Sequence, residues 1–96
     1  MVYNFEWDPV KARGSREKHG VSFEEASTLF RDPRALTVYD PEHSEREERW
    51  ITMGISNSGR LLVVCHTFSE EAGGSVIIRI FSSRKATSDE TRSYGR

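Results

Sequence analysis

The stretch from Trp50 to Phe68, WITMGISNSGRLLVVCHTF, decides the fold that this sequence predicts. Residues of strand composition lie at both of its ends, and the turn residues of 56–59 lie between them. The stretch therefore predicts a β-hairpin with strands over 50–55 and 61–68. Because Leu61 to Cys65 is apolar at every position, we expect the second strand at the centre of the sheet, covered on both faces.

Before the hairpin, the sequence predicts one short strand and a first helix. Aromatic residues alternate with polar ones over 3–7, which is the period of a strand with one aromatic face. Asp8 is a good N-cap, and Pro9 suits the first helical position, where its missing N–H costs nothing. Gly20 is a typical helix stop, so the helix is expected over 9–19.

A second helix and a short strand are expected between the first helix and the hairpin. Ser22 and Glu25 have the spacing of a capping box, and apolar residues then recur on one face, which predicts a helix over 23–31. A short strand is expected over 35–39. The segment 40–49 is almost wholly polar, so we interpret it as a solvent-facing connection.

Beyond the hairpin, the sequence predicts a loose turn over 69–75 and a strand over 76–81. Thr87 and Glu90 have capping-box spacing and open a short terminal helix. The chain of 96 residues is long enough for one domain, expected over 1–96. The order of strand, two helices, three or four antiparallel strands and a last helix indicates the α+β class.

Charge is balanced in total and segregated along the chain. The formal net charge is -1, which argues against a uniformly basic nucleic-acid binder and against a highly charged disordered chain. Residues 21–48 carry three bases and eight acids, a balance of -5, whereas 76–96 carry five bases and two acids, a balance of +3. The chain can therefore offer a cationic site to phosphate while an acidic surface meets a basic partner, unless these charges merely form solvated faces.

Features of membrane proteins and secreted proteins are lacking. No apolar run approaches the roughly 18 residues of a membrane span, and the first residues do not resemble a signal peptide. Cys65 is the single cysteine and lies in an apolar run, so we interpret it as a core residue in a reducing compartment. We expect a cytoplasmic protein that does not contact membrane.

Most enzymatic motifs are missing, and cationic groups remain as the candidates for chemistry. The sequence has no glycine-rich phosphate loop, no Cys-x-x-Cys, no His-x-x-x-His and no G-x-S-x-G, so no metal and no cofactor are expected. The remaining groups lie at a helix end, before a strand, within a strand and after it: Lys18, His19, Arg49, Arg79, Arg84 and Lys85.

These residue types suit RNA cleavage without a metal. Attack of a 2′-hydroxyl on the adjacent phosphate needs a proton acceptor, a proton donor and fixed positive charge, which histidine and arginine supply. They also suit other phosphate binders, and each has a structural interpretation. Lys18 and His19 complement a helix dipole, Arg79 can be an ordinary outward strand residue, and His66 is interpreted as a hydrogen-bonded core histidine.

The sequence resembles the BrnT toxins of type II toxin-antitoxin systems. The resemblance rests on residues 5–8, on the Lys-His-Gly-Val-Ser-Phe block of 18–23 and on the Ser-Arg-Lys-Ala-Thr block of 83–87, and it covers nearly the whole chain. Ser15 stands where the family pattern has asparagine, and Phe81 stands in a stretch that is usually aliphatic. These two departures leave the ionisable residues of the pattern untouched.

The resemblance implies a RelE-like fold with a short N-terminal strand, two helices, an antiparallel sheet of about four to five strands and a short C-terminal helix. It implies a metal-independent endoribonuclease that cleaves RNA and inhibits translation. It further implies a BrnA-type antitoxin with a ribbon-helix-helix module, which neutralises the toxin and through which the pair contacts operator DNA.

The resemblance also implies the residues of the active site. Lys18, His19, Arg49, Arg79 and Arg84 are the expected catalytic residues, with His19 as general acid or base and the others holding phosphate. Glu48 and His43 are reserve candidates for the base, and Tyr94 is a candidate for substrate positioning.

Two other functions remain open from the sequence. One is a catalytically inactive protein that binds the antitoxin and acts as a co-repressor of its own operon. The other is an unrelated small nucleic-acid-binding domain, which would bind RNA without cleaving it. In either toxin interpretation, the acidic stretch 21–48 is expected to contribute to antitoxin docking, because of its balance of -5.

Overall fold

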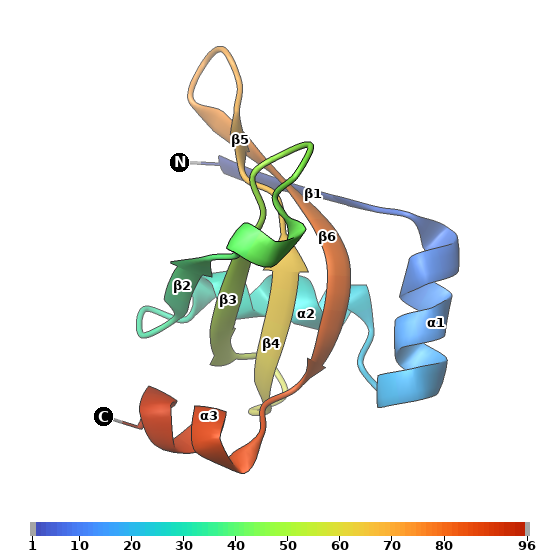
Figure 1. The fold of residues 1–96 in the computed structure, drawn as a ribbon, viewed down its shortest axis with the longest axis vertical. Coiled ribbons are helices and arrows are strands. Elements are labelled where there is room, and N and C mark those ends of the chain that lie inside the picture. The colour runs from blue at the N-terminus through green and yellow to red at the C-terminus, as the bar shows by residue number, and fades with distance from the viewer. Residues whose placement is uncertain (1, 96) are drawn as a thin grey trace.

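The structure, a computed structural model, describes residues 2–95 and places helices against one face of a twisted sheet (Figure 1). Helix α2 crosses one face, α1 lies beside strand β6, and the short helix η2 lies over the opposite face. The elements are β1 Val2–Trp7, α1 Pro9–His19, α2 Phe23–Thr28, η1 Leu29–Arg31, β2 Leu36–Tyr39, η2 Pro41–His43, β3 Trp50–Ile55, β4 Leu61–His66, β5 Ser69–Glu70, β6 Ser75–Lys85 and α3 Ser88–Tyr94.

The predicted hairpin forms the middle of the sheet. Strands β3 and β4 pair antiparallel, and the strand order β1-β6-β4-β3-β2 places β4 at the centre. Leu62 and Val64 are fully buried under α2, and Val63 on the other face is 6% exposed. The α+β class and the central position of this strand are thereby confirmed, whereas its second face is only partly covered, because Leu61 and Cys65 are partly exposed there.

One strand pairing differs from the predicted antiparallel sheet. Strand β1 pairs parallel with β6, from Val2 opposite Ser75 to Trp7 opposite Ile80, so the sheet is mixed. The alternation over 3–7 defines which face of β1 is buried, and it carries no information on strand direction. Trp7 packs edge-to-face on Phe23, with ring centroids 6.0 Å apart, so its ring belongs to the core side.

Strand β6 is longer than predicted, because its polar end continues the strand and buries Ser83. The prediction ended at Phe81, whereas β6 continues to Lys85. Ser83 is 1% exposed and its hydroxyl lies 3.0 Å from that of Ser15, which is itself buried in α1. This polar contact joins α1 to β6, and it gives Ser15, one of the two departures from the family pattern, a structural role.

Strand β4 and the turn after it also differ slightly from the prediction. β4 ends at His66 instead of Phe68, and Ser69–Glu70, expected within a turn, pairs with β6 as β5. Between Cys65 and His66 the register with β6 shifts, which leaves Phe81 without a direct partner, as in a β-bulge. The bulge therefore interrupts β6 in its middle.

His66 is the hydrogen-bonded core histidine that the sequence predicts. Its side chain is 1% exposed, with Nε2 at 2.7 Å from the Thr52 hydroxyl and Nδ1 at 2.9 Å from the Thr67 carbonyl oxygen. Burial lowers the pKa of its imidazole, which favours the neutral form. His66 is thus part of the packing on the α2 side.

The helix ends follow the sequence signals, with one exception. Asp8 accepts a hydrogen bond from Val10 N–H, and the capping box of Thr87 and Glu90 is complete. Ser22 accepts from the Glu25 N–H, but the Glu25 carboxylate does not return to the cap. It instead accepts hydrogen bonds from Arg60 Nε at 2.9 Å and from the hydroxyls of the hairpin turn.

The Glu25–Arg60 pair joins α2 to the hairpin, and it makes the free energy of unfolding depend on pH in the acidic range. Hydrogen bonding to Arg60 lowers the pKa of Glu25 from 4.5 to about 2. A lowered pKa means that the unfolded chain binds the proton more tightly, so this stabilisation is present above pH 4.5 and is lost as the pH falls toward 2.

We expect Glu25→Gln to make the free energy of unfolding fall less steeply between pH 4.5 and 2, as urea titrations at a series of pH values measure. Glu24→Gln, one position earlier, is the control and should retain the wild-type slope.

Candidate functional site

A pocket of about 350 Å³ lies on the sheet face of Val63, opposite the face of Leu62 and Val64 that α2 covers. We call it the sheet-face pocket. Its floor comes from strands β3, β4 and β6, and its polar rim comes from α1 and from the segment 40–49. The lining residues are Lys11, Asp40, His43, Arg49, Ile51, Val63, Cys65, Phe81, Ser82 and Arg84.

Segment 40–49 is held in a closed loop by its own hydrogen bonds. The Asp40 N–H donates to the Arg49 carbonyl oxygen at 2.9 Å, and the Ser44 hydroxyl donates to the Asp40 carbonyl at 2.6 Å while accepting from the Arg49 N–H at 2.9 Å. The segment is solvent-facing, as predicted from its polar composition, and these hydrogen bonds give it a defined loop conformation. The loop brings His43 and Arg49 to the same pocket.

His43 and Asp40 form a pair at the rim of the sheet-face pocket. The Asp40 carboxylate is almost completely buried, and its Oδ2 lies 2.7 Å from Nδ1 of His43, whose side chain is 60% exposed. A carboxylate on Nδ1 orients the imidazole and leaves Nε2 free to accept or donate a proton. His43 therefore has the arrangement of a general acid or base.

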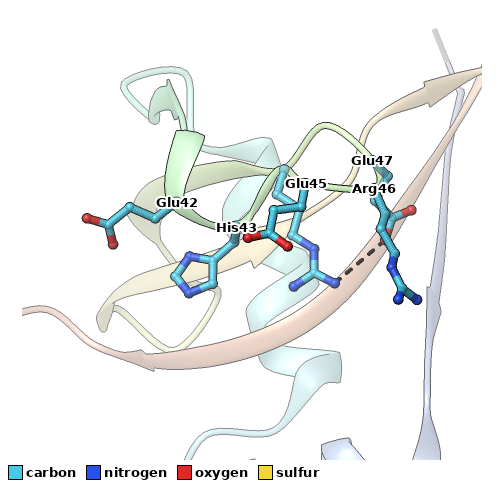
Figure 2. A pocket seen from close by; sticks show the side chains of 6 residues that line it. Glu42, His43, Glu45, Arg46 and Glu47 are labelled. Carbon is cyan, nitrogen blue, oxygen red and sulfur yellow. Dashed lines mark ion pairs between the residues drawn. The ribbon is translucent and has the colours of Figure 1, made fainter.

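An adjoining hollow of about 300 Å³ shares His43 and Arg49 with the sheet-face pocket. Figure 2 shows its side chains, with His43 and Glu45 pointing toward β6 and with Glu42 directed away from them. Glutamates and arginines alternate around it, and the dashed line marks the pair of Arg49 with Glu47 at 3.7 Å. The loop therefore carries both signs of charge at one rim.

Arg49 is fixed by an aromatic ring and retains most of its hydrogen-bonding capacity. Its guanidinium carbon lies 3.9 Å from the centroid of the Phe81 ring, and the ammonium of Lys11 lies 5.2 Å from the same centroid. The Nε of Arg49 is buried and has no hydrogen-bond partner, while Glu47 is half-exposed and lies beyond hydrogen-bond distance. Two cations thus meet at one ring, which suits an anionic ligand.

Arg84 lines the same pocket, and its charge is paired within the chain. Its NH1 and NH2 atoms donate to the two carboxylate oxygens of Glu90 at 2.7 and 2.9 Å. Hydrogen bonding to Glu90 raises the pKa of Arg84, and the same contact with Arg84 lowers the pKa of Glu90 to about 2. A phosphate that approaches Arg84 competes with a bidentate carboxylate.

The structure brings together only part of the predicted site. Arg49 and Arg84 line the sheet-face pocket, and Arg79 lies on β6 near it, paired with Glu6 at 3.7 Å. Lys18 and His19 are exposed at the C-terminal end of α1 and line none of the described pockets. At 1.5 Å per residue, His19 lies about 12 Å from Lys11 along the axis of α1.

The reserve candidates are also separated by the fold. His43 lies in the pocket, as described, whereas Glu48 is exposed on the loop and lines neither hollow. Tyr94 donates its hydroxyl hydrogen to Asp32, and the guanidinium of Arg34 lies 5.5 Å from the centroid of its ring. These contacts hold α3 against the start of β2.

Several pocket residues were not among the catalytic candidates from the sequence. Lys11 shares the four-residue spacing of one helix face with Ser15, which packs on β6, and this spacing is the signal that could have found it. Asp40 precedes His43 by three residues, yet only the loop geometry makes them a pair. Cys65, expected in the core, is half-buried in the pocket wall. Phe81, the second departure from the family pattern, carries the Arg49 guanidinium.

Neither a metal-binding cluster nor a membrane-spanning helix is found in the described part of the chain. Among residues 2–95, no three His, Cys, Asp or Glu side chains are grouped closely enough to hold a metal ion. Over the same residues, no helix is long and apolar enough to cross a membrane.

Comparisons with known proteins agree on one family. Residues 7–90 match the family model described as the ribonuclease toxin BrnT of type II toxin-antitoxin systems. The crystal structure of the Brucella abortus ribonuclease toxin BrnT is similar in fold, with a TM-score of 0.57, 18% sequence identity, and coverage of 91% of this chain and 99% of that one. No curated protein sequence matches this chain.

Cys65 provides a chemical probe of the sheet-face pocket. Burial, followed by the nearby Asp40 carboxylate, raises the pKa of its thiol, so less thiolate is present at pH 8 than in an unfolded chain. We expect iodoacetamide to alkylate Cys65 more slowly in the folded protein than in urea, because burial both raises the pKa of the thiol and restricts access to it. Intact-mass spectrometry over time measures both rates. Equal rates would show that the thiol is open to solvent.

Proposed function

The chain belongs to the BrnT family of ribonuclease toxins of type II toxin-antitoxin systems, and we propose that it is a metal-independent endoribonuclease acting at the sheet-face pocket. The observation that carries the proposal is the meeting of the His43–Asp40 pair with Arg49, held on Phe81, in one pocket. An imidazole with a free nitrogen and a guanidinium with open donors supply the proton acceptor and the positive charge that cleavage by a 2′-hydroxyl needs.

The proposed reaction is an attack within the RNA chain. Nε2 of His43 accepts the proton of the ribose 2′-hydroxyl, while Asp40 stays hydrogen-bonded to Nδ1 and stabilises the imidazolium. The 2′-oxygen forms a bond to phosphorus, and the bond from phosphorus to the 5′-oxygen breaks. The 5′-oxygen takes a proton from water, and His43 then releases its proton to solvent. The products are a 2′,3′-cyclic phosphate and a 5′-hydroxyl.

Positive charge stabilises the pentavalent phosphate in this proposal. Arg49 offers open N–H donors and Lys11 a second charge at the same ring, so both complement the negative charge that develops on the phosphate oxygens. Arg84 adds a third cation once its hydrogen bonds to Glu90 are exchanged for phosphate. These three side chains come from β6, α1 and the residue before β3.

The remaining predicted cations are assigned to binding rather than proton transfer. The sequence prediction made His19 the general acid or base, but the geometry supports His43 better, because His19 is exposed and about 12 Å further along α1 than Lys11. We propose that Lys18, His19 and Arg79 contact phosphates on either side of the cleaved one.

We propose further that the partner is a BrnA-type antitoxin with a ribbon-helix-helix module, and that operator DNA is contacted only through it. Family membership in a type II system supports a protein antitoxin. The expected result of toxin activity is inhibited translation in the cytoplasm. The alternative is an inactive toxin that serves as a co-repressor, and the cleavage assay below separates the two.

RNA cleavage by matched histidine variants tests the proposed function. We expect His43→Ala and Arg49→Ala each to lower the cleavage rate about 100-fold or more, as for the loss of a general base or an electrostatic donor. His19→Ala should lower it less than about tenfold, because it loses a binding contact only. Wild-type cleavage should persist in EDTA and yield a 2′,3′-cyclic phosphate, which mass spectrometry of the fragments identifies.

The opposite order of cleavage rates for the two histidine variants would place the reaction at the end of α1. A folded His43→Ala protein with full activity and an inactive His19→Ala protein would refute the sheet-face pocket and restore the sequence-based site. A wild-type protein that cleaves no RNA and arrests no growth would favour the inactive co-repressor. Loss of activity in EDTA would refute metal independence.

Acidic residues of segment 40–49 are proposed to contact the antitoxin. Glu25, Asp32 and Asp40 are used in contacts within the chain, so the free part of the acidic stretch is concentrated in 42–48. Charge reversal at Glu45 and Glu47 should weaken binding of the ribbon-helix-helix protein encoded beside the toxin gene about tenfold, as isothermal titration measures. An unchanged affinity would remove these residues from the docking surface.

A further inference from the structure

Strand β2 is an edge strand of four residues whose own side chains offer little protection against pairing. It is the last strand in the order β1-β6-β4-β3-β2, and its sequence Leu36–Tyr39 contains neither a charge nor a proline. Leu36, Val38 and Tyr39 are 46%, 59% and 44% exposed. Edge strands of monomeric proteins usually carry lysine, proline or a bulge that prevents strand addition. An exposed apolar edge of this kind indicates an interface.

The pairing of β2 with β3 defines which backbone groups of β2 face outward. The Asp40 N–H donates to the Arg49 carbonyl oxygen, its direct partner in the register that pairs Leu36 with Met53. Hydrogen-bonded pairs alternate along an antiparallel ladder, so Leu36 and Val38 also direct their N–H and C=O groups toward β3. Thr37 and Tyr39 therefore direct theirs away from the sheet, toward a further strand.

We propose that this further strand is β2 of a second copy of the chain, paired antiparallel about a two-fold axis. The two outward-facing residues then meet each other, with Thr37 of each copy opposite Tyr39 of the other. This register satisfies the outward N–H and C=O groups of both residues in both copies. Val38 lies on the axis, opposite Val38 of the second copy, where its exposed side chain is covered by its own counterpart.

Charge complementarity favours a second copy over an unrelated strand. The chain is basic before β2, at Arg31 and Arg34, and acidic after it, from Glu42 onward. An antiparallel two-fold pairing places the beginning of one β2 beside the end of the other, so opposite charges meet twice. The pairing thereby brings the turn before β2, which carries Arg34, toward the segment after β2 of the other copy, which carries Glu42.

The dimer has a geometric consequence for the sheet-face pocket. Val38 and its partner Ile51 share a sheet face with the pocket, since Ile51 lines it. A two-fold axis through Val38 runs perpendicular to the sheet, so both pockets open on the same side of one continuous sheet. The inference does not depend on the proposed cleavage, because it rests only on the edge of β2 and its flanking charges.

Sedimentation equilibrium of the full chain tests the dimer. We expect a concentration-dependent mass of twice 11.0 kDa for the wild type. Val38→Lys should raise the dissociation constant about tenfold or more, because two like charges then face each other at the axis. Val10→Lys is the matched control, since Val10 is an exposed valine, at 68%, that lies on α1 rather than on β2; it should dimerise like the wild type. Circular dichroism verifies that each variant is folded.

Charge-swap and cysteine variants test the register. Arg34→Glu and Glu42→Arg should each weaken the dimer, and the double variant should restore it. In a Cys65→Ser background, Val38→Cys should form a disulfide-linked dimer on mild oxidation, because a directly opposed pair of this kind brings the Cα atoms to about 4.5 Å. Thr37→Cys, opposite Tyr39 rather than itself, should stay largely reduced.

Three results would overturn the proposal. The first is a wild-type protein that stays monomeric at concentrations up to about 1 mM, where even weak association is detectable. That result would favour an antitoxin strand as the partner of β2. The second is a dimer that Val38→Lys does not weaken, and the third is a Val38→Cys protein that does not cross-link. None of these outcomes bears on RNA cleavage, so the two proposals fail separately.

Discussion

The contact of the Arg49 guanidinium with the Phe81 ring, 3.9 Å from its centroid, is the interaction on which the polar face of this protein depends. It requires the bulge opposite Cys65 and His66, which leaves Phe81 outside the ladder so that Phe81 and Ser82 both line the pocket. It also requires the closed loop of 40–49, which returns the chain from Asp40 to Arg49. A planar ring holds the cation without neutralising it, in contrast to the carboxylates that hold Arg60 and Arg84.

The two faces of the sheet differ in composition. The α2 face buries the apolar core and His66, while the opposite face carries Lys11, His43, Arg49 and Arg84 around a shallow apolar floor. This division explains how a chain with a net charge of -1 can present a cationic site. The net charge predicts whether a protein binds nucleic acid non-specifically. It does not reveal a local cluster of a few cations that a loop and a helix bring together.

Much of the fold could be predicted because its signals are local. The hairpin over 50–68, the N-cap at Asp8 and the capping box at Thr87 each rest on neighbouring residues, and each is present in the structure. The parallel pairing of β1 and the extension of β6 to Lys85 depend on contacts far apart in sequence, above all that of Ser15 with Ser83. The site was harder to predict for the same reason. The Lys18-His19 block is a recognisable sequence motif, whereas Asp40, His43 and Phe81 meet only through a loop and a bulge.

The central claim is that the reacting phosphate binds at the sheet-face pocket, beside Arg49 and His43. Nuclear magnetic resonance of the protein with a 2′-O-methyl RNA dinucleotide, which cannot be cleaved through the 2′-oxygen, tests this claim most directly. The account predicts a large shift of the Arg49 Nε–H signal and of amide signals from segment 40–49 and from Phe81. Shifts confined to the end of α1, at Lys18 and His19, with the Arg49 signal unchanged, would contradict it.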